Sequence, residues 1–365
     1  MQPPSFKTYP LLKPLSWLYQ QIMSIRNQRF DSGKLHTQSF NLPVVSVGNI
    51  SVGGTGKTPM CRYILQLFND AGMSPALLSR GYGRKTKGLR QVTADSTAAL
   101  VGDEPLEMYS HFEGTIPVYV CEDRCSGARQ ILSTNNNVKT LVLDDAYQHR
   151  YINRDLNIML TDYNRLYTRD KVMPEGRLRE APCGAGRADI IVVTKCPQDL
   201  SATDAQHILK EIKPTARQQV FFTTIKYTPL HAPYRDMALT AQRTKYANPT
   251  KDNLKALHVL IFTGIAKATP LIEYYKSLTP SIETMHFADH HAFTLYDIQR
   301  IVTKSDLADI VITTSKDFQR LPDDIPHCLK EKLFVQHIDI QFLFDRRQAF
   351  NQLVLQATNH PKYHN

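Results

Sequence analysis

PVVSVGNISVGGTGKTPMCRY, the stretch from Pro43 to Tyr63, sets the architecture expected of this chain. It opens on the apolar, β-branched run from Val44 to Val47, which predicts a buried strand. A glycine-rich loop follows, and a helical pattern then begins at Lys57. This order is typical of a phosphate-binding loop, because glycines let backbone N–H groups turn inward and the helix start adds its positive dipole end.

The loop predicts a nucleotide site with a metal ion. Lys57 is expected to reach the outer phosphates, and the Thr58 hydroxyl is expected to ligate Mg²⁺. Ser51 stands where the usual pattern has its first glycine, so the match is imperfect. A purely structural loop is the alternative, but strand, glycines, Lys-Thr and helix together favour nucleotide binding. The residues expected to hold the nucleotide are Ser51, Val52, Gly53, Gly54, Thr55, Gly56, Lys57 and Thr58.

The composition describes an ordinary globular protein. A length of 365 residues predicts about two domains. The net charge of +10 favours an anionic partner, which could be nucleic acid, a phosphorylated ligand or an anionic membrane surface. No nucleic-acid-binding motif is present and the basic residues are scattered, so we expect no nucleic-acid partner. No apolar run approaches the ~20 residues of a membrane span, and the N-terminus has no signal-peptide pattern.

The six cysteines include no CxxC pair. Cys121 and Cys125 are four residues apart near a strand end, which is a poor basis for a zinc site on their own. We therefore expect free thiols in a reducing compartment.

Residues 9–29 predict an amphipathic helix. Leu15, Leu18, Ile22 and Ile25 recur at helical spacing, with aromatic and basic residues beside them. Such a helix can lie in a bilayer interface with its apolar face down, or it can pack on the neighbouring domain. The pattern alone favours neither.

Charged groups follow several predicted strands. The basic, glycine-hinged loop Arg80–Arg84 follows a strand over 74–79, at the edge where ligands bind in open parallel sheets. The apolar strand over 140–143 ends in Asp144 and Asp145, the arrangement with which phosphate-loop enzymes hold Mg²⁺.

Two further segments carry charges that suit this chemistry. Asp103 and Glu104 begin a predicted helix, either to complement its dipole or as an acid/base or metal-side pair. The loop 174–180 is rich in arginine, which suits bidentate phosphate binding.

Thr194–Pro197 resembles a guanine-reading TKxD motif, but Pro197 replaces the carboxylate, so ATP is favoured over GTP.

Alternating strands and helices predict two α/β/α sandwich domains with mostly parallel sheets. We expect a membrane-associating helix over residues 1–30, a phosphate-loop domain over 31–227, a linker over 228–253 and a smaller α/β domain over 254–365.

Six motifs occur in this order in one family. They are SVGGTGKTP (51–59), SRGYGR (79–84), GDEP (102–105), LDDAYQHR (143–150), GRLRE (176–180) and ADHHAF (288–293). On these residues, which span most of the chain, it resembles the tetraacyldisaccharide 4'-kinases, the lipid A 4'-kinases of Gram-negative envelope synthesis. The displaced first glycine is itself a feature of that family. The family's more usual DDGFQH is DDAYQH here, and alanine makes the local backbone less permissive than glycine would.

The resemblance implies an ATP- and Mg²⁺-dependent kinase. It would phosphorylate the 4'-hydroxyl of a tetraacyl-glucosamine disaccharide 1-phosphate, giving lipid IVA, at the cytoplasmic face of the inner membrane. It favours interfacial membrane binding for the first helix, and makes the lipid substrate and the membrane surface the expected partners, without an obligate protein partner. A soluble metabolite kinase, a nucleotide-dependent switch protein and a nucleic-acid ATPase are the competing hypotheses.

The resemblance also implies residue roles. Asp103 would be the base that activates the sugar hydroxyl, oriented by His290 or alternatively His291, with Lys57 as the further catalytic residue. The alternative is that the Asp–His pair is an interdomain hydrogen bond without a catalytic part. The metal-side candidates are Thr58, Asp144, Asp145 and Glu104. The candidates for binding the acceptor and its 1-phosphate are Arg80, Tyr82, Arg124, Gln148, His149 and Arg179.

Overall fold

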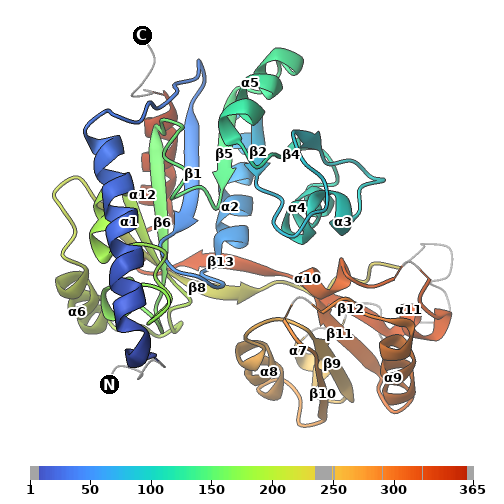
Figure 1. Cartoon of the computed structure of the whole chain (residues 1–365). Coiled ribbons are helices and arrows are strands. Elements are labelled where there is room, and N and C mark those ends of the chain that lie inside the picture. The colour runs from blue at the N-terminus through green and yellow to red at the C-terminus, as the bar shows by residue number, and fades with distance from the viewer. Residues whose placement is uncertain (1–7, 235–248, 250, 290, 323, 360–365) are drawn as a thin grey trace. The chain divides into compact units, whose positions relative to one another are not determined.

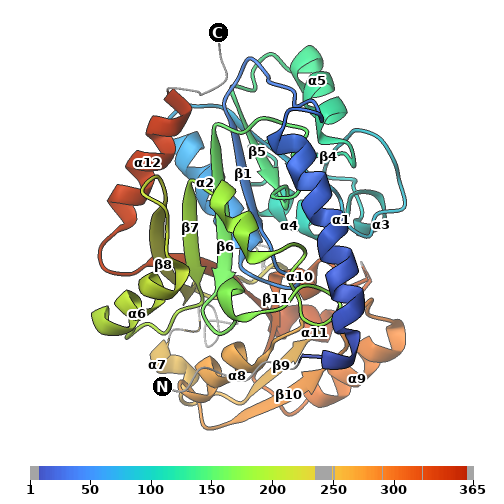
Figure 2. The same cartoon turned by 60° about the vertical axis from the view of Figure 1, so that its left-hand side comes forward.

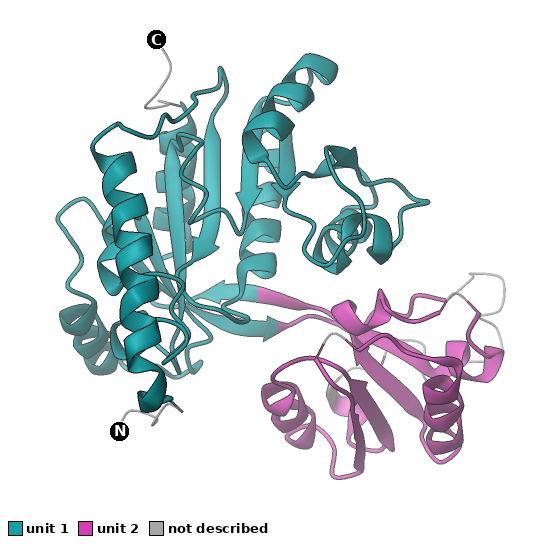
Figure 3. Cartoon of the chain, in the orientation of Figure 1, with its two compact units in different colours: residues 1–226, 340–365 teal, residues 227–339 magenta. Residues whose placement is uncertain are grey.

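The computed structural model describes residues 8–234, 249, 251–289, 291–322 and 324–359. The chain divides into two compact units (Figure 3). Unit 1 comprises Met1–Lys226 and Ile340–Asn365, and unit 2 comprises Tyr227–Asp339. The chain therefore passes from one unit to the other twice.

Unit 1 contains a nine-stranded sheet with the order β13-β8-β7-β6-β1-β5-β2-β4-β3. Figure 1 shows its strands β6, β1, β5 and β2 side by side. Its strands are β1 (Val44–Asn49), β2 (Pro75–Ser79), β3 (Arg90–Gln91), β4 (Val118–Val120), β5 (Thr140–Asp144), β6 (Leu156–Asp162), β7 (Ile190–Thr194), β8 (Gln219–Tyr227) and β13 (Ile338–Phe342). β1 pairs in parallel with both β5 and β6, and Val47 is opposite Asp144. This register brings the loop after β1 beside the end of β5.

Helices cover both faces of this sheet, as the α/β/α prediction requires. On one face, α2 (Lys57–Asp70), α4 (Asp103–His111) and α12 (Arg347–Asn359) contribute to a single apolar cluster. On the other face, α5 (Arg124–Thr134) packs over β2 and β5, and α6 (Ala202–Ile212) packs over β7. The short α3 (Ala98–Val101) precedes α4. Figure 2 shows α12 and α1 (Lys13–Asp31) on opposite sides of the strands.

Unit 2 has its own four-stranded parallel sheet, in the order β10-β9-β11-β12. The strands are β9 (Val259–Thr263), β10 (Ile282–His286), β11 (Ile310–Thr314) and β12 (Leu333–Gln336). The helices are α7 (Lys251–Leu254), α8 (Thr269–Lys276), α9 (Leu295–Ser305), α10 (Ser315–Phe318) and α11 (His327–Lys332). Separate apolar clusters involve α9 with α11 and α7 with α8, so this sheet is also covered on both faces. The second α/β sheet predicted from sequence is thus present.

The domain boundaries expected after residue 227 need correction. The segment 340–365 belongs to unit 1 rather than to the smaller domain. β13 lies beside β8, and Phe350 and Val354 of α12 are fully buried in the unit 1 core. The apolar residues between 333 and 344 form two strands rather than one, because the chain leaves one sheet after β12 and enters the other at β13. An apolar strand pattern does not tell which sheet the strand joins.

The expected linker also differs at its start. His231 forms an isolated β-bridge with Val335, so this segment is part of unit 2 rather than a free connection. Residues 235–248 and 250 of the predicted linker lie outside the described residues.

Candidate active site

The loop between β1 and α2 has the backbone that its glycines allow. Gly53 and Gly56 have φ values of +112° and +87°, a region that side chains with a Cβ rarely adopt. Asn49 Nδ2 donates to Thr55 Oγ1 over 2.6 Å, and the Val52 N–H donates to the Arg177 carbonyl over 2.8 Å. The loop is therefore held in place by hydrogen bonds from its own strand and from the arginine-rich loop.

Lys57 and the acidic pair meet at this edge. Lys57 is the first residue of α2, and its Nζ lies 3.8 Å from Asp145 Oδ1. Thr58 follows in the first turn and is buried. The glycine-rich loop thus lies beside the end of the Asp144 strand, and this placement follows from the parallel pairing of β1 with β5.

Asp144 is in an unfavourable environment for a carboxylate. It is buried, with Ser79 Oγ donating to Oδ2 over 3.0 Å and Cys61 Sγ lying 3.6 Å from Oδ1. Burial, followed by repulsion from Glu104 and Asp145, raises its pKa to about 6. A divalent cation held by oxygen ligands would relieve this repulsion, so the donor set fits Mg²⁺.

Asp145 connects the acidic pair to the arginine-rich loop. Arg179 makes two hydrogen bonds to its carboxylate, of 2.9 and 3.1 Å. The Arg179 N–H also donates to the Ile50 carbonyl over 2.7 Å, and Ser51 forms a β-bridge with Leu178. The loop over 176–180 therefore lies directly against the phosphate loop.

The alanine in DDAYQH does not strain the backbone. The residue with a left-handed conformation is Asp145, with φ of +46°, and Ala146 is not among the positive-φ residues. Glycine is instead required at Gly48, where a Cβ would come within 2.8 Å of Tyr147 Cβ. Ala146 therefore adopts a backbone conformation that does not require glycine, although alanine is less permissive there.

Two loops meet beside Asp103, which begins α4. A Cβ at Gly102, whose φ is +93°, would lie 2.9 Å from the Tyr82 carbonyl. A Cβ at Gly81, whose φ is +68°, would lie 2.8 Å from the Val101 carbonyl. These close approaches bring the SRGYGR loop against the start of α4. Within that loop Arg80 and Tyr82 are exposed.

The remaining acceptor candidates have different environments. Arg124 is buried and donates to the carbonyls of Glu122 and Asp144 over 3.3 and 3.4 Å, and burial lowers its pKa. Its placement supports the end of β5. Gln148 Nε2 donates to the Asn49 carbonyl over 2.8 Å and to Glu180 Oε1 over 3.0 Å. Burial and the nearby Arg124 lower the pKa of His149 to about 4.

The pair Thr194–Lys195 supports the phosphate loop in a way that sequence reasoning missed. Thr194 Oγ1 donates to the Thr55 carbonyl over 2.8 Å. Lys195 has a φ of +58°, its Nζ donates to the Gly54 carbonyl, and it pairs with Asp162 at 3.2 Å. In the sequence these residues resemble a base-reading motif, which gives no sign of a contact with the phosphate loop. A lysine directly after a strand was the sequence signal that could have indicated a contact with the phosphate loop.

In unit 2, His290 lies outside the described residues. His291 Nε2 is 2.9 Å from Asp297 Oδ2, and its ring stacks on Phe287 with the centroids 5.0 Å apart. Asp297 and Thr294 form a capping box at the start of α9. His291 is therefore engaged with the start of its own unit's helix.

The polar side of helix α1 packs against the rest of unit 1. Tyr19 Oη donates to the Arg179 carbonyl over 2.9 Å, and Asn27 Nδ2 donates to Glu180 over 3.0 Å. The predicted apolar stripe faces away, with Leu15, Leu18, Ile22 and Ile25 each between 52% and 58% exposed. The helix thus packs on the domain and still presents an apolar surface. Among the described residues, we find no helix both long and apolar enough to cross a bilayer.

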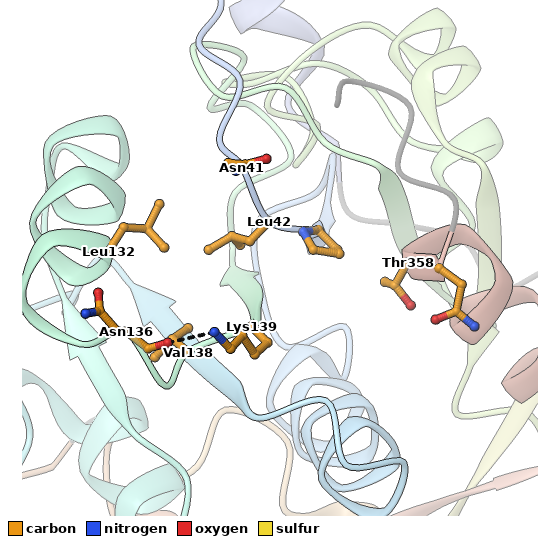
Figure 4. A pocket seen from close by; sticks show the side chains of 9 residues that line it. Asn41, Leu42, Leu132, Asn136, Val138, Lys139 and Thr358 are labelled. Atoms are coloured by element: carbon orange, nitrogen blue, oxygen red, sulfur yellow. Dashed lines mark hydrogen bonds between the residues drawn. The ribbon is translucent and has the colours of Figure 1, made fainter. Parts of the chain in front are cut away.

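A hollow of about 480 Å³ lies elsewhere in unit 1 (Figure 4). It is lined by residues including Leu42, Leu132, Val138, Lys139 and Thr358. Leu42 and Lys139 precede β1 and β5, so the hollow is at the amino ends of these strands. The phosphate loop and acidic pair follow the carboxyl ends, so the hollow is not part of the candidate active site.

A parallel α/β sheet with a glycine-rich loop, a lysine at the helix start and an acidic strand end defines a phosphate-loop kinase fold. The family model described as "Tetraacyldisaccharide-1-P 4'-kinase" matches residues 8–359. The chain belongs to this family.

Named relatives and a solved structure agree. The chain is 39% identical to the tetraacyldisaccharide 4'-kinase of Bacteroides fragilis strain YCH46, over 97% of this chain and 94% of the relative. It is 43% identical to that of Cytophaga hutchinsonii, over 93% of each. A crystal structure described as the "apo" form of the Aquifex aeolicus enzyme in complex with ATP has a TM-score of 0.72 and 27% identity, over 96% of this chain and 99% of that one.

Proposed function

We propose that this protein transfers the γ-phosphoryl group of ATP to the 4'-hydroxyl of a tetraacyl-glucosamine disaccharide 1-phosphate, giving lipid IVA. The observation that carries the proposal is the meeting of Lys57 with the acidic pair at the carboxyl ends of β1 and β5, in a chain of this family. Phosphoryl transfer depends mainly on positioning and on neutralising charge, and this edge offers groups for both.

The nucleotide would lie on the backbone of residues 51–58, with the Lys57 ammonium beside its outer phosphates. The residues for Mg²⁺ are Thr58, Asp144, Asp145 and Glu104, and the ion would neutralise charge on the phosphates when bound. Lys57 and Arg179 both contact Asp145 in this structure. Binding of Mg²⁺·ATP would give Asp145 a stronger partner, and Arg179 would then be released toward the acceptor.

Asp103 would accept the proton of the 4'-hydroxyl, a contribution of ~10²–10⁴-fold for a positioned base. Its place at the start of α4, beside the SRGYGR loop and in the same GDEP segment as Glu104, supports this role. The orienting role of His290 remains a prediction from the sequence. The local hydrogen bond of His291 to Asp297 supports His290 as the better candidate of the two.

The acceptor would bind beside α1. Its candidate contacts are Arg80, Tyr82, Arg124, Gln148, His149 and Arg179, among which Arg179 is hydrogen-bonded to Tyr19 of α1 through its carbonyl. The exposed stripe of α1 supports peripheral attachment to the cytoplasmic face of the inner membrane. Acyl chains could then stay in the bilayer during the reaction, because extracting them costs ~0.8 kcal/mol per CH₂.

A transfer assay with radiolabelled ATP and tetraacyl disaccharide 1-phosphate in detergent micelles tests the proposal, beside a lipid-free control. We expect labelled lipid only when the acceptor is present, and much slower turnover with near-normal ATP affinity in Asp103→Ala and His290→Ala. Label without the lipid would indicate a metabolite kinase, and near-normal turnover in both variants would remove the base assignment.

The membrane role has its own test. Leu18→Glu with Ile22→Glu changes the exposed stripe and leaves the polar side of α1 untouched. We expect this variant to lose binding to anionic vesicles, while Gln28→Glu, also at an exposed position of α1, retains it. Equal vesicle binding by both variants would contradict the interfacial role.

A further inference from the structure

Three side chains that can ligate a metal ion, each of a different kind, lie close together near the start of α5. One ligand atom from each of Asp123, Cys125 and His149 lies within 4.8 Å of the others. We call these residues the Asp-Cys-His cluster. Cys125 Sγ is 4.0 Å from His149 Nε2. The phosphoryl transfer proposed above gives no part to Cys125.

The spacing is close to that of a tetrahedral metal site. Zn–S and Zn–N bonds of ~2.3 and ~2.0 Å at a tetrahedral angle place sulfur and nitrogen about 3.5 Å apart. A shift of about half an ångström would therefore bring Cys125 and His149 to bonding distance. Asp123 is exposed, so an ion can enter from solvent at its carboxylate.

Hydrogen bonds to the local backbone hold the residues of the cluster in place. Asp123 is the N-cap of α5, and its Oδ1 accepts from the Cys125 N–H over 2.9 Å. Cys125 is buried, with its Sγ 3.4 Å from the Tyr151 carbonyl to which it donates. The backbone N–H of His149 donates to the Ala146 carbonyl over 2.9 Å. A metal would replace the thiol proton and with it the hydrogen bond to the Tyr151 carbonyl, and it would leave the backbone N–H contacts of Cys125 and His149 intact.

Charge determines which ions can bind. Burial lowers the pKa of His149 to about 4, and the charges of Arg124, Arg154 and Arg26 act in the same direction against the opposing Asp123, which leaves a neutral imidazole at neutral pH. These guanidinium groups repel a bare cation. One thiolate and one carboxylate cancel a divalent charge, so only an ion that displaces the thiol proton forms a neutral complex. Soft thiolate ligands select Zn²⁺ over Mg²⁺.

We propose that the Asp-Cys-His cluster is a binding site for a thiophilic divalent cation of the zinc class, with water as the fourth ligand. The cation would bond to Cys125 Sγ, His149 Nε2 and one Asp123 oxygen, and the thiol proton would leave to solvent. His149 is a candidate acceptor contact, so occupancy would remove it from the acceptor and slow the kinase. This consequence rests on the proposed function.

Cobalt(II) alone is the first probe, added to the full-length, chelator-treated protein without ATP or lipid. We expect a thiolate-to-cobalt charge-transfer band that saturates at one equivalent and is lost in Cys125→Ser. Cys183→Ser and Cys328→Ser are matched controls at exposed free thiols and should retain it. No band in the wild type, or an equal band in Cys125→Ser, would overturn the site.

Zinc competition and activity complete the test. Asp123→Asn should bind zinc more weakly by at least about tenfold. The loss of an outer-sphere partner already costs ~10-fold in metal affinity, and a direct ligand should cost no less. Added zinc should slow the wild type in excess Mg²⁺·ATP and leave Cys125→Ser, with normal basal turnover, largely unaffected. Cobalt binding without zinc inhibition would overturn the role of His149. Absence of any kinase activity would overturn the proposed function. The cobalt titration would still decide whether the Asp-Cys-His cluster binds a metal, because it does not depend on activity.

Discussion

Asp144 of unit 1 and Asp297 of unit 2 are carboxylates in opposite situations. Asp144 ends β5 among other carboxylates, and burial with repulsion from Glu104 and Asp145 raises its pKa to about 6. Asp297 caps α9, and hydrogen bonds from Thr294, helped by His291, lower its pKa to about 2. The charge of Asp144 is only partly compensated, by Ser79 and Lys57, whereas hydrogen bonds outweigh burial at Asp297.

The contrast extends to Asp317 of unit 2. It is fully buried, yet it accepts from Thr263 over 3.0 Å and from Thr314 over 2.7 Å, with Arg320 at 3.4 Å. A carboxylate satisfied within its own unit contributes to architecture, whereas one that is destabilised until a cation arrives suits a binding site. Substitutions at these carboxylates, and at the lysines beside the phosphate loop, distinguish the two kinds of site.

The largest effect is expected from Lys57→Ala. Removing a preorganised charge at the transferred group should lower turnover by about 10³-fold or more. The fold should persist, because the partner Asp145 still has Arg179. The transfer assay measures the effect, with Lys139→Ala as a control at the amino end of β5. A loss of less than tenfold would contradict the placement of ATP phosphates at Lys57.

Asp144→Asn should lower turnover, by less than Lys57→Ala does, and should stabilise the nucleotide-free protein above about pH 6. The folded-state pKa of Asp144 lies above its unfolded value, so the folded protein binds the proton more tightly. That stabilisation is fully present below the unfolded pKa of ~3.9 and is lost as pH rises through about 6. Thermal unfolding across this range should show the wild type losing stability relative to the variant. Parallel curves would contradict the raised pKa.

Asp317→Ala should destabilise the protein by about 3 kcal/mol, because buried donors lose their acceptor and Arg320 loses its counter-charge. Chemical unfolding of the full chain measures the change. The matched control is Asp306→Ala at an exposed position in the same unit, expected within ±0.5 kcal/mol of wild type. Equal stability of the two variants would show that Asp317 is not a structural carboxylate.

The smallest effect is expected from Lys195→Met, which removes the hydrogen bond to the Gly54 carbonyl. We expect KM for ATP to rise by about tenfold, the cost of ~1.4 kcal/mol, with a smaller change in turnover. Lys213→Met is the control, because Lys213 is exposed and also has a left-handed φ, of +50°. The same rise in both variants would point to the backbone instead.

Much of unit 1 could be predicted because its signals are local. Val44–Val47, the glycine-rich loop and the helix from Lys57 follow each other directly, and parallel pairing then places Asp144 and Asp145 beside them. The amphipathic pattern of α1 was also readable. Its orientation was not, because the choice depends on Tyr19 and Asn27 finding partners on a loop some 150 residues away.

The amino-acid order alone was enough to establish the phosphate-loop class, the family and the α/β character of both units, because hydrophobic period and glycine position act over short stretches of chain. Tertiary contacts were needed for the rest. The return of β13 and α12 to unit 1, the support that Lys195 gives to Gly54, and the raised pKa of Asp144 each arise from groups distant in sequence. Electrostatic and packing energies depend on distance in space, which local patterns do not record.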